Sequence, residues 1–196
     1  MSLDIIYGFP VLKAKMTNHE EILKGFLPFI ENDNNFDFPK TWDCSCKTTI
    51  DDQEKNSKFP WHLFFENINT ILADYSAKIG LSKNALLRMN GQAWVNKYDQ
   101  GNAQEVHDHK GTNNLISCAY MLKLPTDSAQ FTFYQSNYEV FPKHLNFLFD
   151  TPAGSAVKPP LEEGDVIFFP SSAAHYVSSH RLTEVRASIS ANFDIS

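Results

Sequence analysis

Two histidines separated by one residue, His107 and His109, are the side chains of this sequence best suited to binding a metal ion. The segment around them reads as extended chain, and on an extended backbone successive side chains point to opposite faces. The two imidazoles would then face one pocket, with Asp108 turned away from it. Neutral imidazole is the commonest protein ligand of divalent transition metals. The spacing therefore predicts a metal site.

A third ligand is predicted at His175. Residues 164–175 read as a strand, a short turn and the start of another strand. This reversal of the chain would bring His175 back to the same pocket. The sequence contains seven histidines, and a single histidine is usually a surface residue or a hydrogen-bonded core residue. A His-x-His pair in a strand-rich half, followed by a further histidine and then an arginine, favours a metal site over that ordinary role.

The last predicted strand contains an arginine that we expect to be buried. Apolar and polar side chains alternate in residues 184–193, as expected of a strand that packs on one face and lines a cavity with the other. Its polar face consists of Arg186, Ser188, Ser190 and Asn192. We predict that Arg186 faces the cavity, where a guanidinium group can bind a carboxylate through two parallel, charge-assisted hydrogen bonds.

The first half of the chain is predicted to support these strands with helices. Residues 17–30 and 60–80 each carry apolar side chains at helical spacing, so each forms one buried stripe. A short edge strand is predicted within residues 4–16. Residues 31–59 read as a polar loop with a short strand at 42–50, and we expect this loop to rim a substrate entrance.

Beyond residue 86 the spacing of apolar residues becomes alternating, which is typical of strands. One long strand is predicted over residues 86–98, where Gln92, Trp94, Asn96 and Tyr98 share a polar and aromatic face that suits a wet cavity. Further strands are predicted at residues 115–124, 130–134, 147–150, 166–169 and 184–193.

This order of elements predicts a mainly β fold with flanking helices, a double-sheet, cupin-like jelly roll. We expect residues 1–196 to form one domain, because single hydrophobic cores commonly grow to this size. Within it, residues 1–85 would be the helical support and residues 86–196 the jelly-roll core. The mouth of such a barrel is a favoured ligand site.

Composition narrows the possible partners. The net charge of −6 argues against binding to nucleic acid, which requires clustered lysine and arginine. Three cysteines, Cys44, Cys46 and Cys118, do not suggest a disulfide framework, and a soft metal pair at Cys44 and Cys46 has no matching second pair. No run of about 18 apolar residues and no export signal is present, so we expect a cytoplasmic protein without a membrane anchor.

Several stretches of the sequence together resemble the Fe(II)- and 2-oxoglutarate-dependent oxygenases, in particular a small group found in bacteria and phages. The resemblance covers roughly residues 90–194, about half the chain. Its more specific half is Arg186, which lies eleven residues after His175 in an Arg-x-Ser pattern. The residues that carry it are Trp94-Val-Asn-Lys-Tyr98, Gly101, Gln104, His107-Asp-His109, Glu163-Gly-Asp-Val-Ile-Phe-Phe-Pro-Ser171, His175 and Glu184-Val-Arg186-Ala-Ser188-Ile-Ser190-Ala-Asn192-Phe193.

The resemblance implies a double-stranded β-helix that holds Fe(II) and uses 2-oxoglutarate as a cosubstrate. Such a dioxygenase converts 2-oxoglutarate to succinate and CO2 while it hydroxylates a second substrate. In this interpretation Arg186, aided by Ser188 or Tyr120, holds the distal carboxylate of 2-oxoglutarate. The residues that could line the rest of the pocket are Asn96, Tyr98, Gln104 and Asn192.

The His-x-His motif departs from the broad family, which normally has His-x-Asp or His-x-Glu and therefore two histidines and one carboxylate around the metal. Either the metal has three neutral ligands, His107, His109 and His175, or Asp108 supplies the carboxylate on a kinked backbone. Strand alternation favours His109. A neutral ligand set leaves more net positive charge on the metal.

Two alternatives to this function stay open at the level of sequence. One is a cupin-like metal-binding module in which Arg186 makes a structural ion pair. The other is a three-His dioxygenase that does not use 2-oxoglutarate. For an oxygenase, the acidic composition leaves small molecules or peptide side chains as substrates, and the sequence carries no signal for oligomeric state.

Overall fold

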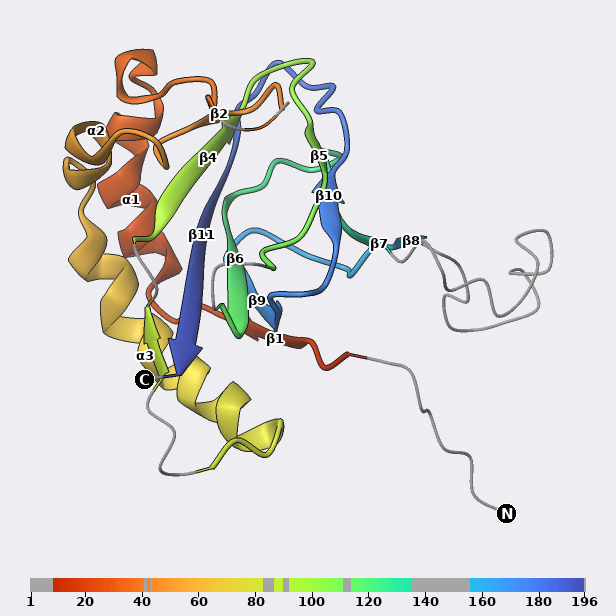
Figure 1. Ribbon diagram of the computed structural model, residues 1–196. Helices are drawn as coiled ribbons and strands as arrows, with labels where there is room; N and C mark the ends of the chain where they lie inside the picture. The colour runs from red at the N-terminus through yellow and green to blue at the C-terminus, as the bar shows by residue number, and fades with distance from the viewer. Residues whose placement is uncertain are drawn as a thin grey trace, which may run out of the picture.

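The elements that position the candidate residues are drawn in Figure 1. A computed structural model describes residues 9–40, 42, 44–82, 87–89, 92–110, 114–134 and 156–195. The helices are α1 (His19–Ile30), the 3-10 helix η1 (Asp33–Asn35), α2 (Gln53–Ser57) and α3 (Trp61–Lys78). The strands are β1 (Leu12–Lys15), β2 (Lys47–Thr48), β3 (Leu87–Met89), β4 (Trp94–Tyr98), β5 (Gln104–His107), β6 (Ile116–Lys123), β7 (Phe131–Tyr134), β8 (Ala156–Val157), β9 (Asp165–Pro170), β10 (His175–Val177) and β11 (Arg186–Ile195).

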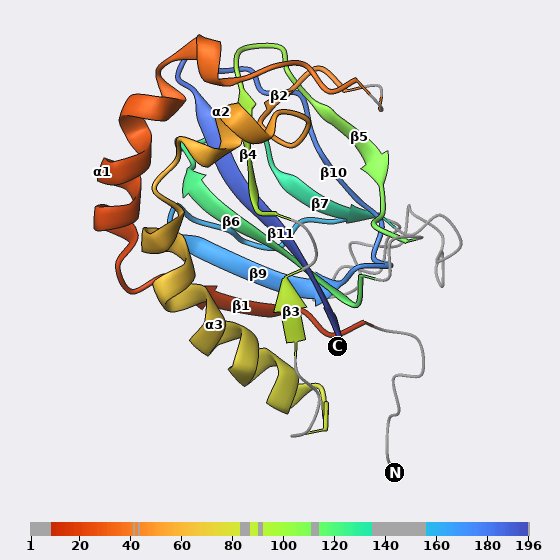
Figure 2. The ribbon, with the colours of Figure 1, turned by 60° about the vertical axis from the view of Figure 1, so that its left-hand side comes forward.

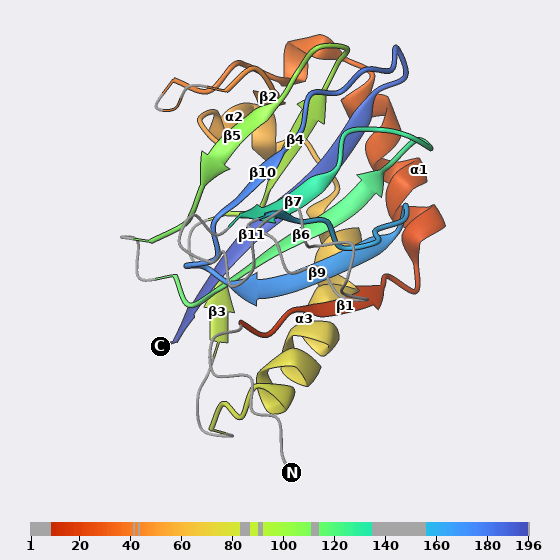
Figure 3. The same ribbon diagram turned by 90° about the vertical axis from the view of Figure 1, so that its right-hand side faces the viewer.

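Two antiparallel sheets lie face to face, and the helices cover the outer face of the larger sheet (Figure 1 and Figure 2). The strand order of the larger sheet is β1, β9, β6, β11, β4, β2, and β3 pairs with β11 beside this path. The smaller sheet has the order β5, β10, β7, β8, and it stands in front of the larger one in Figure 3. The predicted jelly roll with flanking helices is confirmed.

Helices α1 and α3 are the two helices that the apolar stripes predicted. Phe26 of α1 and Phe64 of α3 are fully buried in one cluster with Val95 and Ile189 of the larger sheet. This cluster is the outer half of the core, and a second cluster around Phe131 fills the space between the sheets. Within the described residues, no helix combines the length and apolar character needed to cross a membrane.

The segment 31–59 contains more structure than the sequence predicted. It includes η1 and α2, while its strand β2 is shorter than the predicted one. Helix α2 begins after Asp52, whose carboxylate accepts a hydrogen bond from the Lys55 amide at 3.0 Å. Asn56 ties the helix to the sheet by donating to the Ala93 carbonyl at 2.9 Å. Polar side chains hold this helix in place, so apolar spacing gave no signal for it.

The prediction of one long strand over residues 86–98 is wrong. The chain instead forms two strands, β3 and β4, which pair with opposite ends of β11. Met89 lies opposite Phe193, whereas Tyr98 lies opposite Arg186. The strand predicted at 147–150 lies outside the described residues.

Strand β11 runs through the centre of the larger sheet and has the two faces that its sequence predicted. Ala187, Ile189 and Ala191 are fully buried in the cluster beneath the helices. Arg186 and Ser188, on the opposite face, line a narrow cavity between the two sheets. The strand therefore separates the structural core from the candidate site.

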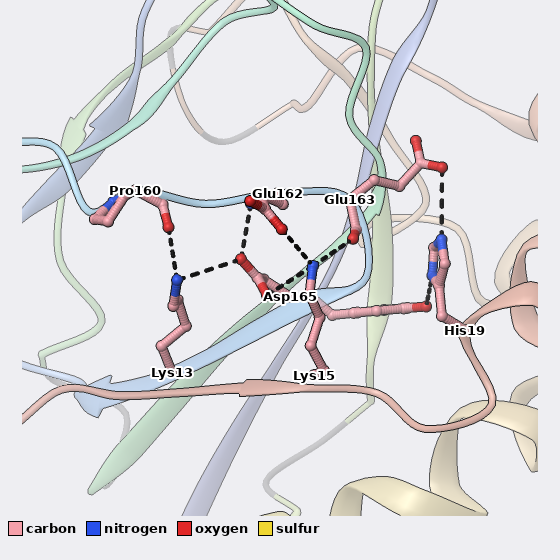
Figure 4. A network of polar contacts seen from close by, with 8 residues as sticks. Lys13, Lys15, His19, Pro160, Glu162, Glu163 and Asp165 are labelled. Atoms are coloured by element: carbon pink, nitrogen blue, oxygen red, sulfur yellow. Dashed lines mark hydrogen bonds and ion pairs between the residues drawn. The ribbon is translucent and has the colours of Figure 1, made fainter.

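The edge strand β1 is held to the turn before β9 by a network of ion pairs and hydrogen bonds (Figure 4). The Lys15 ammonium group lies 3.1 Å from both Asp165 and Glu162 and donates to the Glu163 carbonyl at 3.0 Å. Lys13 donates to the Pro160 carbonyl at 2.9 Å. Because the Asp165 side chain is only 2% exposed, this pairing is less screened by solvent than an ordinary surface ion pair.

Gly164, in the same turn, is expected to tolerate no side chain. Its φ of +84° is unfavourable for other residues, and an added Cβ would lie 3.0 Å from Cγ of His19. We therefore expect Gly164→Ala to lower the free energy of unfolding by about 1–3 kcal/mol, measured by urea denaturation. Gly80 is the matched control, since its φ is +78° but no atom of the described residues lies within 4 Å of an added Cβ. Equal costs at the two positions would contradict crowding against His19.

Candidate metal and cosubstrate site

The structure brings the three predicted histidines together between the sheets. His107 ends β5 and His175 begins β10, and the two residues are directly opposite each other in register. His109 lies two residues beyond β5, where its amide donates to the Ser171 carbonyl at 2.9 Å. One ligand atom from each ring lies within 4.8 Å of the others. Ligand bonds of about 2.1 Å place ligand atoms roughly 3–4 Å apart, so the cluster is close to the size of a metal site.

Two of the rings are oriented by their own strands. The Nδ1 atom of His107 donates to the Glu105 carbonyl, and Nδ1 of His175 donates to the Ala173 carbonyl, each at 2.9 Å. A carbonyl can only accept, so the proton of each neutral ring is on Nδ1 and the lone pair is on Nε2. Such hydrogen bonds fix the tautomer and the orientation of metal-binding histidines.

The ring of His109 is oriented by side chains of the larger sheet. Its Nδ1 atom lies 2.8 Å from Oδ1 of Asn192 on β11 and 2.8 Å from Oγ of Ser117 on β6. Ser117 also donates to Asn192 Oδ1 at 2.7 Å and contacts the Ser171 hydroxyl at 2.8 Å. Asn192, a predicted pocket residue, therefore acts on the site through His109. Ser117 and Ser171 were not predicted as site residues, because a serine within or directly after an apolar strand gives no signal of its orientation.

The environment of the cluster favours neutral imidazoles. Burial, and then the neighbouring His107, lower the pKa of His109 to about 4. Burial and the two other rings likewise lower the pKa of His175 well below its usual value. A neutral ring keeps its lone pair for a metal, so the pocket is suited to binding a cation near neutral pH.

The metal-free protein is expected to lose stability as the pH falls from 6.5 towards 4. His109 has a pKa of about 4 in the folded protein, against 6.5 for an unperturbed histidine. Between these values only the unfolded chain binds a proton at this position, so acidification favours unfolding, and His175 acts in the same direction. Urea denaturation at pH 7 and pH 5 measures the effect. His109→Gln should reduce the change in the free energy of unfolding between pH 7 and pH 5. An unchanged difference would show that another group is responsible.

Asp108, the alternative ligand, lies outside the histidine cluster. Its carboxylate accepts a hydrogen bond from the Lys110 amide at 3.0 Å and lies 3.0 Å from the Lys110 ammonium group. Burial acts to raise the pKa of Asp108, but the contacts with Lys110 outweigh it and the pKa is lowered. The Asp108 side chain thus contacts Lys110 and is not part of the histidine cluster.

Arg186 is buried at the start of β11, with only 1% of its surface exposed. Its guanidinium carbon lies 4.5 Å from the centre of the Tyr98 ring, and its Nε donates to the Ala129 carbonyl at 3.0 Å. Its Nη2 lies 3.6 Å from the Met121 sulfur, a weak acceptor. No carboxylate of the described residues forms an ion pair with Arg186. The expectation of a structural ion pair therefore has no support in the described part of the chain.

Three buried polar atoms in the cavity have no hydrogen-bond partner among the described residues. They are Nη1 of Arg186, the indole nitrogen of Trp94 and the amide oxygen of Asn96. An unpaired buried polar group costs roughly 1–3 kcal/mol, and each one in a folded protein requires an explanation. A bound polar ligand that pairs with these atoms would remove the cost.

Four of the predicted pocket residues line the cavity, namely Ser188, Asn96, Tyr98 and Gln104. The register between β5 and β10 shifts by one residue between His175 and Val177. Because of this bulge, Gln104 and His107 both line the cavity although they are three residues apart.

Tyr120 is placed differently from the prediction. Its side chain is fully buried in the cluster beneath the helices, where its hydroxyl group lies 2.7 Å from Nδ1 of His19. Tyr120 therefore points to the opposite face of the larger sheet from Arg186, and its predicted contact with the cosubstrate is corrected. Tyr98, which stacks on Arg186, occupies the position beside the guanidinium group instead.

The site is suited to a metal with an affinity for nitrogen ligands and to a ligand with a carboxylate. Three imidazoles suit iron, zinc and copper, and they lie in one cavity with an arginine whose Nη1 has no partner among the described residues. On a jelly roll, this combination defines a mononuclear metal enzyme with an anionic cosubstrate.

Comparison with known families identifies the class. The profile of the family described as "Putative 2OG-Fe(II) oxygenase" matches residues 92–192, which is more than half of the chain. The chain belongs to this family of 2-oxoglutarate- and Fe(II)-dependent oxygenases. A search of the curated proteins gave no match.

Solved structures show the same fold at low sequence identity. A prolyl-4-hydroxylase from Pseudomonas putida is 12% identical, with a TM-score of 0.63 over 96% of this chain and 93% of that one. A prolyl hydroxylase from Trichoplax adhaerens, in complex with a peptide of hypoxia inducible factor, is 12% identical, with a TM-score of 0.61 over 94% and 83%. The epimerase SnoN, in complex with Fe3+, alpha ketoglutarate and nogalamycin RO, is 14% identical, with a TM-score of 0.61 over 94% and 78%.

Proposed function

We propose that this protein is a dioxygenase that hydroxylates a second substrate while 2-oxoglutarate is converted to succinate and CO2. The observation that carries the proposal is the shared cavity of three histidines and one buried arginine with an unpaired nitrogen. We also propose that residues 1–196 work as one domain, because the helices of the first half bury the outer face of the sheet that carries the site.

In this proposal His107, His109 and His175 hold Fe(II). The donor set fits the ion, because the three ligand atoms lie within 4.8 Å of one another and the pKa shifts of His109 and His175 keep their rings neutral. When bound, the metal supplies the oxygen chemistry, and the protein supplies orientation and electrostatics. The Nδ1 contacts of the three rings hold the ligand atoms in place before any metal binds.

Arg186 and Ser188 hold the distal carboxylate of 2-oxoglutarate. Arg186 is already oriented by the Tyr98 ring and the Ala129 carbonyl, so little side-chain entropy is lost when it binds the cosubstrate. Its unpaired Nη1 offers the charge-assisted hydrogen bond that a carboxylate needs. Because the cavity is buried, this interaction is stronger than it would be in water.

Aromatic rings form the apolar wall of the site. Phe131 stacks on His175 with ring centres 5.0 Å apart, and Phe169 meets the same ring edge-on at 5.0 Å. Both side chains line the cavity and are at least 95% buried. They exclude water from the side of His175 that faces the core, which protects a reactive site from side reactions.

Trp42, which belongs to segment 31–59, lies beside the histidine cluster. Its ring centre lies 6.1 Å from that of His107, and its buried indole nitrogen has no partner among the described residues. This position supports the expectation that the segment rims the substrate entrance. We propose a small molecule or a peptide side chain as the substrate, since the related structures hold a peptide and a small natural product.

Calorimetry tests the proposal directly. Mn(II) is used as a redox-inert substitute, and 2-oxoglutarate is titrated into the protein with and without the metal. We expect binding of 2-oxoglutarate that depends on Mn(II), and release of succinate when Fe(II) and oxygen are supplied. Metal binding without any 2-oxoglutarate binding would refute the proposal.

One observation favours a second candidate, a three-His dioxygenase that does not use 2-oxoglutarate. No carboxylate of the described residues belongs to the cluster, whereas the broad family has one. The two candidates differ in a single product, because only the first releases succinate. The unpaired Nη1 of Arg186 favours the first.

A further inference from the structure

Cys44 and Cys46 are a pair of nucleophilic groups that the proposed mechanism does not use. Neither cysteine is part of a disulfide bond, and their sulfur atoms are 3.2 Å apart. A disulfide bond is about 2.05 Å long, so the two atoms need to approach by roughly 1 Å to form one. Among the described residues, the histidine cluster is the only group of three or more metal-ligating side chains, and the two cysteines are not members of it.

The pair lies next to Tyr98, at the end of the cavity where Arg186 would bind the cosubstrate. Cys46 is completely buried, and it packs in one cluster with the Tyr98 side chain. The Tyr98 hydroxyl donates to Gln104 at 2.8 Å, and the face of its ring carries the guanidinium group of Arg186 at 4.5 Å. One buried tyrosine thus separates the sulfur atoms from the arginine.

The backbone around the pair is tied to the strand that carries His107. Between the cysteines, the Ser45 amide donates to the Ala103 carbonyl at 3.2 Å, and the Ala103 amide donates to Ser45 Oγ at 2.8 Å. Ala103 directly precedes β5. Because protein interiors are close-packed, a movement of about 1 Å at Cys46 must be absorbed by Tyr98 or by this anchored segment.

We propose that Cys44 and Cys46 form a reversible disulfide and that its formation weakens binding of 2-oxoglutarate at Arg186. The second part rests on the proposed function, whereas the first does not. The bond would displace the Cys46 sulfur from its contact with Tyr98 and so shift the ring that supports Arg186. Disulfides that close short loops and are partly exposed are also the more easily reduced ones, which suits a reversible change.

The oxidant is a hydroperoxide, and the reaction balances with two molecules of water. Cys44 is the partly exposed thiol, whereas the hydrogen bond to Cys44 and then burial raise the pKa of Cys46. The Cys44 sulfur attacks hydrogen peroxide, the O–O bond breaks, and a sulfenic acid and water form. The Cys46 sulfur then attacks the Cys44 sulfur, the S–O bond breaks, and the hydroxyl group leaves as water with the Cys46 proton.

The experiment treats the full-length, metal-free protein with hydrogen peroxide and removes the peroxide before any measurement. Alkylation of the unfolded protein counts the thiols, which should fall from three to one, and peptide mass spectrometry locates the bond. Calorimetry with Mn(II) then measures binding of 2-oxoglutarate by the reduced and oxidised forms. We expect about tenfold weaker binding after oxidation, a size typical of coupled sites, and full recovery after dithiothreitol.

Cys44→Ser is the matched variant, because the residue is partly exposed and outside the cavity. It should bind 2-oxoglutarate as the reduced wild type does and should not respond to peroxide. Oxidation of Met121 would weaken binding in this variant too and would not be reversed by dithiothreitol. A thiol count that stays at three, or equal affinities of the reduced and oxidised forms, overturns the inference. Absence of 2-oxoglutarate binding in the reduced protein would instead refute the proposed function, while the thiol count still tests the disulfide.

Discussion

Replacing His175 by alanine is expected to reduce the affinity for Mn(II) by at least about 100-fold and to abolish succinate release. Mutations of groups that merely orient metal ligands cost about 10–100-fold, so loss of a ligand should cost more. His107→Ala and His109→Ala should have effects of the same order, because the three ring nitrogens form one group. Calorimetry with Mn(II) measures the affinity, and circular dichroism checks the fold.

Asp108→Asn is the matched control for these variants. It removes the one carboxylate in the motif but keeps the size of the side chain. Since Asp108 contacts Lys110 and not the cluster, its affinity for Mn(II) should stay within about threefold of the wild type, a difference below 1 kcal/mol. A large loss in Asp108→Asn with normal binding in His109→Ala would show that Asp108 is the ligand after all.

Arg186→Lys is expected to weaken binding of 2-oxoglutarate by about 100-fold or more while metal binding is retained. Loss of a buried, hydrogen-bonded charge partner typically costs about 2–5 kcal/mol, and lysine cannot offer the planar fork of an arginine. The lysine keeps the positive charge, so this variant is less prone to unfold than Arg186→Ala. Calorimetry with Mn(II) present measures both affinities in one series.

Arg181→Ala serves as the control for charge alone. Arg181 is exposed on the loop before β11, so its removal changes the net charge without touching the cavity. Its affinity for 2-oxoglutarate should equal that of the wild type at physiological salt. If both arginine variants weaken binding equally, the general charge of the protein and not the buried guanidinium group attracts the cosubstrate.

Strand β11 shows what could be predicted from the sequence. Apolar and polar residues alternate along it, because one face packs against the helices and the other lines the cavity. The inward direction of Arg186 and Ser188 follows from that alternation. The same argument predicts His107 and His109 on one side and Asp108 on the other, and the group of histidines in the structure contains the first two and not Asp108.

Strand β6 shows why the rest could not be predicted. Both of its faces are buried from Ile116 to Leu122, so no alternation of polar and apolar residues marks the cavity side. Tyr120 and Ser117 were therefore assigned wrongly or overlooked. No signal in the sequence marks helix α2, because polar contacts hold it in place. None marks the bulge in β5 either, because the bulge depends on the register with a distant strand.

The three rings differ in how easily natural mutations could change their orientation. His107 and His175 bind the main-chain carbonyls of Glu105 and Ala173, and every amino acid supplies a carbonyl at those positions. His109 alone depends on side chains from two other strands. In the proposed site, exchange of one hydroxyl or amide group would therefore change the orientation of a single ligand while all three histidines are kept.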